Sequence, residues 1–97
     1  MAEINFNKSS NKLEIKGDIG FSDVMALQQA GEQRIMAHPN CEIDLKHIGV
    51  CNIACIAMLV SWKRLARRQK QTLTYIQTPT LIEHLARVHG VYALLFE

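Results

Sequence analysis

The chain has 97 residues, of which 48% are apolar and 21% charged, and its formal net charge is +2 at pH 7. This size predicts one domain over residues 1–97 and excludes a cofactor domain joined to a substrate domain. So small a net charge does not by itself indicate nucleic-acid binding. The N-terminal stretch alternates polar and apolar residues and lacks the apolar run of a signal peptide, so we expect a cytoplasmic protein.

The first elements form a predicted hairpin followed by a helix. Apolar residues alternate with polar ones in 4–6 and 13–15, and the polar NKSSN between them is typical of a hairpin loop. A helix is predicted from Ser22, as its N-cap, to about Ala37. Its apolar face consists of Val24, Leu27, Gly31 and Ile35.

The second half alternates strands and helices. CEIDL (41–45) reads as a strand, a helix runs from a capping Asn52 to about Gln69, and TLTYIQ (72–77) is the next strand. Thr78 and Pro79 indicate the start of a helix that ends near Gly90, with an apolar stripe of Leu81, Leu85 and Val88. VYALLFE (91–97) fits either a strand or a short helix. This order predicts an α/β fold with a mixed sheet of about four strands and helices packed against it.

The uncharged stretch GVCNIACIAMLVSW (49–62) raises the question of a membrane, metal or redox role. It falls short of the ~20 residues that a membrane-spanning helix needs. Three cysteines in a chain without an export signal indicate reduced, largely buried thiols, and the spacing of Cys51 and Cys55 is not that of a zinc site. The four histidines are scattered. We therefore expect no metal and no cofactor.

A helical projection of this region gives a core-facing arc and an outer arc that is unusually apolar. The core-facing arc consists of Cys55, Met58, Leu59, Trp62, Leu65, Ala66 and Gln69. The outer arc consists of Ile53, Ile56, Ala57 and Val60, followed by Lys63, Arg64, Arg67 and Arg68. Either the C-terminal segment of the same chain covers the apolar half, or these are scattered surface residues, or a partner protein binds here. We favour a partner, because cations border the apolar surface and free N–H groups at the helix start can receive an acceptor.

Catalytic patterns are absent from the sequence. Asp18, Asp23, Glu42 and Asp44 are not paired with a histidine or nucleophile at a recognisable spacing, and no phosphate-binding or nucleophile-elbow motif is present. We predict that the protein is not an enzyme. The basic turn of the helix lacks interleaved aromatic residues, so a nucleic-acid partner is not expected either.

Three segments resemble the STAS domain, most closely its MlaB-like branch: LEIKGDI (13–19), CEIDLKHIGVCNIACIAMLVSWKRLARRQ (41–69) and LIEHLARVHGVYALL (81–95). In that family an I-D-L strand is followed by D-[ST]-x-[GA], which aligns with Ile43–Leu45 and with Cys51–Ala54. Asn52 thus stands at the phosphorylatable Ser or Thr of anti-sigma factor antagonists and cannot accept a phosphoryl group. The resemblance also implies that VYALL forms a short helix packed against the sheet.

The resemblance implies a function as well. MlaB-like members are small cytoplasmic subunits of an ABC-type phospholipid transport system that maintains outer-membrane lipid asymmetry in Gram-negative bacteria. They bind its ATPase subunit and are peripheral to the inner membrane, without inserting into it. The alternative is an anti-sigma factor antagonist or a similar switch. By resemblance the partner contacts the start and outer face of the helix, so the predicted site is Cys51, Asn52, Ile53, Ile56, Ala57, Val60, Arg64 and Arg67.

Overall fold

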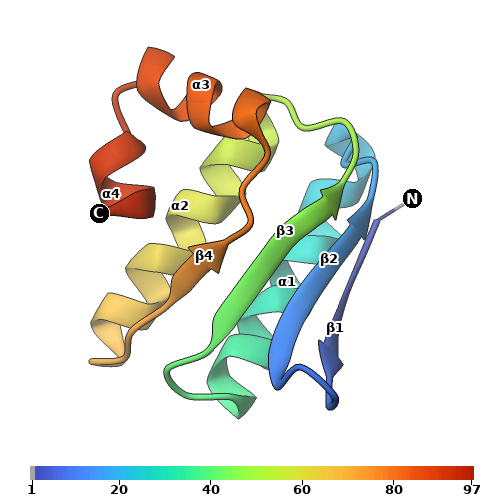
Figure 1. Cartoon of the computed structure of the whole chain (residues 1–97), viewed down its shortest axis with the longest axis vertical. Helices are drawn as coiled ribbons and strands as arrows, with labels where there is room; N and C mark the ends of the chain where they lie inside the picture. Colours follow the sequence, from blue (N-terminus) through green and yellow to red (C-terminus); the bar gives the residue numbers. More distant parts are fainter. Residues whose placement is uncertain (1) are drawn as a thin grey trace.

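Residues 2–97 are described by a computed structural model with four strands and four helices in the order β-β-α-β-α-β-α-α (Figure 1). The elements are β1 (Glu3–Asn7), β2 (Lys12–Gly17), α1 (Phe21–Ala37), β3 (Glu42–Ile48), α2 (Ile53–Arg68), β4 (Thr74–Ile76), α3 (Thr80–Val88) and α4 (Tyr92–Phe96). The predicted order is confirmed, and the last segment is a short helix, as the family resemblance implied. No helix of residues 2–97 is both long and apolar enough to cross a membrane.

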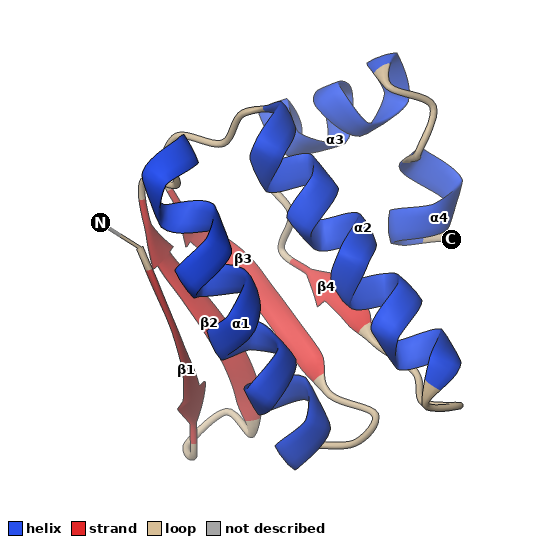
Figure 2. Cartoon of the chain, turned by 180° about the vertical axis from the view of Figure 1, so that it is seen from behind, coloured by secondary structure: helices blue, strands red, loops and turns tan. Residues whose placement is uncertain are grey.

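The four strands form one mixed sheet in the order β1-β2-β3-β4. β1 and β2 pair antiparallel, while β2, β3 and β4 run parallel to one another. The predicted α/β fold, an N-terminal hairpin followed by parallel strands, is therefore confirmed. Both long helices, α1 and α2, lie on the same face of the sheet (Figure 2), and the fully buried Leu13, Ile15, Ile43 and Leu45 come from the two central strands.

Helix α1 begins two residues earlier than predicted. Gly20 is the N-cap, not Ser22, and the backbone N–H of Gly20 donates to the Asp23 carboxylate at 3.1 Å. The prediction was wrong because an acidic side chain at the third helical position satisfies the helix start by itself. The predicted core face is confirmed for Leu27, Gly31 and Ile35, which are buried, and Val24 packs at its edge.

The two long helices approach closely where Gly31 meets Trp62. A Cβ atom on Gly31 would overlap the indole ring of Trp62, which is fully buried. The indole Nε1 donates to the backbone oxygen of Gln28 at 3.1 Å. Glycine in the middle of α1 therefore makes room for the largest side chain of the core.

The C-terminal helices α3 and α4 pack beside α2. Ile82 and Ala86 are the buried residues of α3, whereas Leu81 and Val88 are 57% and 63% exposed. The predicted stripe is therefore wrong for Leu81 and Val88, while Leu85 is half-buried and packs against the core. The apolar residues of α3 form one wide arc, and its Ile82–Ala86 edge is the part that is buried. Helix α4 contacts α2 and β4, with Leu95 buried.

Candidate partner-binding site

The start of α2 is fixed by its own N-cap. The Oδ1 atom of Asn52 accepts hydrogen bonds from the backbone N–H groups of Ala54 and Cys55, at 2.9 and 3.2 Å. The predicted capping role is confirmed. The Asn52 side chain thus satisfies two backbone N–H groups of the first turn.

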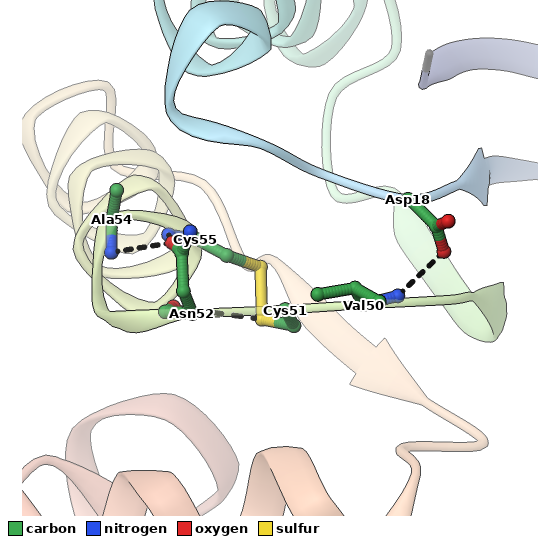
Figure 3. The surroundings of a disulfide bond; sticks show 6 residues. All are labelled: Asp18, Val50, Cys51, Asn52, Ala54 and Cys55. Carbon is green, nitrogen blue, oxygen red and sulfur yellow. Dashed lines mark hydrogen bonds between the residues drawn. A yellow bond between two sulfur atoms is a disulfide. The ribbon is translucent and has the colours of Figure 1, made fainter.

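The loop before α2 is joined to the last residue of β2 and to the loop before α1 by three hydrogen bonds. The Asp18 carboxylate accepts from the backbone N–H of Val50 at 2.8 Å (Figure 3), Ile19 N–H donates to the Val50 oxygen at 2.9 Å, and Gly49 N–H donates to the Gly17 oxygen at 3.0 Å. A Cβ atom on Gly49 would overlap the Asp18 carboxylate. A side chain at position 49 would therefore displace this carboxylate from the Val50 N–H, and the three hydrogen bonds hold the two segments together.

Cys51 and Cys55 form a disulfide bond across the N-cap (Figure 3). Their Cα atoms lie 5.5 Å apart, which is within the usual range for a disulfide. The expectation of reduced thiols is wrong for this pair, while Cys41 is a free cysteine. The chain turns at Asn52, so the side chain of Cys51 returns over the first turn of the helix and reaches Cys55. Spacing along the sequence alone gives no indication of this return.

Predicted site residues lie on the surface only in part. Ile53 is 47% exposed, and Ala57, Arg64 and Arg67 are exposed as well, while Asn52 and Val60 are half-buried. Ile56 is 2% exposed and Cys51 is 6% exposed. The placement of these two on the outer surface was wrong, because both are buried in the core. Helices α3 and α4 contact α2, and Cys51 is joined to Cys55 by the disulfide. The C-terminal segment therefore covers part of the predicted face, as one alternative held.

Large exposed apolar side chains lie at the end of the molecule where α2 starts, and of these the sequence analysis selected only Ile53 for the site. Because parallel strands end at one edge of the sheet, the helices that follow them start together, at the top of Figure 1. We call the exposed large apolar residues at these helix starts the apolar end; they are Phe21, Met25, Val50, Ile53 and Leu81, between 47% and 76% exposed. The only available signal was the one-turn spacing of Phe21 and Met25, off the predicted core face of α1.

Basic side chains follow the apolar end along α2. Arg64, Arg67 and Arg68 are exposed, and within residues 2–97 the one ion pair closer than 4.0 Å joins Lys16 to Glu14. Lys63 differs from these arginines because its Nζ donates to the Leu73 oxygen and lies 5.7 Å from the centre of the Tyr75 ring. Burial, and secondarily the charge of Arg67, lowers the pKa of Lys63. The outward cations are therefore the three arginines.

Carboxylates and other possible metal ligands are spread along residues 2–97. No three His, Cys, Asp or Glu side chains among residues 2–97 come together in a way that could hold a metal ion. Asp44, the one buried charged residue that the structure describes, accepts hydrogen bonds from the Lys46 backbone and the Gln77 side chain at 2.8 and 3.2 Å. Its carboxylate is occupied by structural contacts.

Comparison with protein families identifies the family of this chain. The family model described as "Mlab, STAS domain" matches residues 2–96. The chain belongs to this family. No curated protein matches the chain. The STAS fold therefore accounts for nearly all of the residues, including the loop, N-cap and helix that carry the candidate site.

Proposed function

We propose that this STAS-domain protein is a non-catalytic subunit that binds the ATPase of a Mla-type ABC phospholipid transporter and regulates or stabilises it. Membership in the MlaB-like family supports the class of complex. The single observation that carries the proposal is the apolar end, which adjoins the N-cap and outer face of α2. The proposed site comprises Asn52, Ile53, Ala57, Val60, Arg64 and Arg67 of the predicted set, together with Phe21, Met25, Val50 and Leu81.

Burial of apolar surface would provide most of the binding free energy. Each large apolar side chain that moves from water into an interface contributes roughly 1.5–3 kcal/mol. Surface apolar residues are common singly, but a group of them at one end of a small protein is typical of an interaction site. The exposed arginines of α2 lie on one side of this group, so an acidic rim on the ATPase would complement it.

Asn52 supports the transporter role over the anti-sigma alternative. A serine-kinase switch needs a hydroxyl at this position, whereas Asn52 offers an amide whose oxygen already accepts two backbone hydrogen bonds. Under this proposal the protein is cytoplasmic and reaches the inner membrane only through the ATPase, with no insertion of its own and no nucleic-acid partner.

Affinity capture from the native host tests the proposal. The protein is used as bait in detergent-solubilised membranes and cytosol, and bound proteins are identified by mass spectrometry. Recovery of the transporter ATPase is expected, whereas recovery of an anti-sigma kinase or of nucleic acid in its place would overturn the proposal. The double variant Phe21→Ser/Met25→Ser should lose the ATPase, while Met36→Ser, at the other end of α1 and 49% exposed, should retain it.

A further inference from the structure

We infer that Cys51 and Cys55 form a reversible redox site that sets the conformation of the loop before α2. The structure joins them in a disulfide, with Cys51 just before the N-cap and Cys55 in the first turn (Figure 3). The proposed function places the protein in the cytoplasm, where disulfides are usually transient and act in catalysis or redox sensing. A pair that brackets the start of a candidate binding helix is suited to sensing.

The exchange reaction has a defined direction of attack. Cys55 is fully buried within α2, whereas Cys51 lies in the loop before the helix and retains 6% exposure as a residue. We therefore assign the first attack of an external thiolate of the glutathione class to the Cys51 sulfur. Attack forms a mixed disulfide on Cys51 and releases Cys55 as a thiolate, which takes up a proton. A second external thiol then frees Cys51. Two external thiols are oxidised to their disulfide, and the protein disulfide gains two electrons and two protons.

Reduction has to move the loop rather than the helix. The two sulfur atoms must separate from bonding distance to van der Waals contact, and the surrounding core is closely packed. Cys55 is fixed in α2 among fully buried residues, while Cys51 lies in the segment between the Asp18 contact and the Asn52 cap. The displacement therefore falls on Cys51 and its neighbours Val50 and Asn52.

Cys41, the third cysteine, does not form an alternative disulfide with Cys51. Cys41 lies just before β3, and Cys51 follows the end of that seven-residue strand, so about 20 Å of extended chain separate them. Disulfide formation requires Cα atoms within about 7 Å. Burial also raises the pKa of the Cys41 thiol, which makes it a poorer nucleophile at neutral pH.

The consequence for binding rests on the proposed function. The disulfide holds Val50 and Ile53 in the arrangement described above, so the oxidised protein presents a preorganised apolar end. The reduced protein must order this loop again when it binds, and we expect roughly threefold to tenfold weaker binding of the ATPase.

The first experiment equilibrates the purified protein in mixtures of reduced and oxidised glutathione, then blocks and counts thiols by intact mass after denaturation. The count should change from three to one as the mixture becomes oxidising, and peptide mapping should place the bond between Cys51 and Cys55. Cys41→Ser should change from two to zero, while Cys51→Ser should form no intramolecular bond. A count of three in the wild type at every ratio would overturn the inference.

The second experiment measures amide hydrogen exchange of both forms, with the ATPase affinity as a separate readout. Amides 50–54 should exchange faster after reduction, whereas those of β2 should not change. Equal exchange at 50–54 would refute the loop movement. If the thiol count and exchange respond but neither form captures the ATPase, the proposed function fails and the redox site stands. The variant Cys51→Ser should behave like the reduced wild type under all conditions.

Discussion

The two sides of α2 differ in packing although both are apolar over the first two turns of the helix. On one side Cys55, Met58, Leu59 and Trp62 are fully buried against the sheet and α1. On the other side Ile53 is 47% exposed, whereas Ile56, only three residues later, is 2% exposed and part of the core, on a helix that α3 and α4 contact. Whether an apolar residue of α2 belongs to the core or to the candidate interface therefore depends on whether other elements of the fold bury it. Substitutions that separate stability from binding test this distinction.

The largest contrast is expected between Ile56→Asp and Ile53→Asp. Ile56→Asp removes a buried side chain and places an unpaired carboxyl group in the core, which should cost at least about 4 kcal/mol of unfolding free energy. Ile53→Asp should change the unfolding free energy by no more than about 0.5 kcal/mol, because Asp is favourable in the first turn of a helix. Urea titrations of both variants measure the difference. Similar losses would mean that the outer side of α2 is ordinary core.

Gly31→Ala, a substitution in α1, tests the packed side of α2. Its added methyl group overlaps the Trp62 indole, so we expect a loss of about 1–3 kcal/mol despite the better helix propensity of alanine. Thermal melts should show a decrease of roughly 4–8 °C per kcal/mol. In a Trp62→Phe background the smaller ring leaves space, and the penalty of Gly31→Ala should shrink. An undiminished penalty there would assign the effect to something other than the α1–α2 contact.

Ile53→Asp should also weaken the complex with the ATPase. The side chain loses its share of apolar burial, and its carboxylate has to be desolvated at the interface. We expect at least a tenfold loss of affinity, which corresponds to ~1.4 kcal/mol. Isothermal titration calorimetry on the folded variant measures this loss, and unchanged affinity would exclude Ile53 from the interface. Met36→Asp, an exposed position at the far end of α1, serves as the control that should bind normally.

The smallest effect concerns the basic stripe. Arg64→Ala together with Arg67→Ala should slow association a few-fold at low salt, because charges at an interface rim act mainly on the on-rate and are screened within ~10 Å at 0.1 M salt. The off-rate should change little. Stopped-flow binding at two ionic strengths gives both rates. A faster off-rate with an unaltered on-rate would place these arginines inside the interface.

Much of the fold could be predicted from the sequence because its periodic signals are local. The alternation of the hairpin, the Asn52 cap and the core face of α1 each depend on residues within one or two turns. The stripe of α3 could be predicted only in part, because its apolar residues span one wide arc and tertiary packing decides that the Ile82–Ala86 edge is buried while Leu81 and Val88 are exposed. The cover over Ile56 and the pairing of Cys51 with Cys55 depend in the same way on where the chain turns back on itself.

The contact between Asp18 and Gly49 limits which side chains position 49 can hold. Gly49 is exposed, yet any side chain there overlaps the carboxylate that accepts the Val50 N–H. In a saturation mutagenesis scan, position 49 should therefore tolerate as few substitutions as a core position. Exposed Ala57, on the adjoining helix, should accept many when folding alone is selected. Solvent exposure would then fail as a guide to mutational tolerance in the loop that leads into α2.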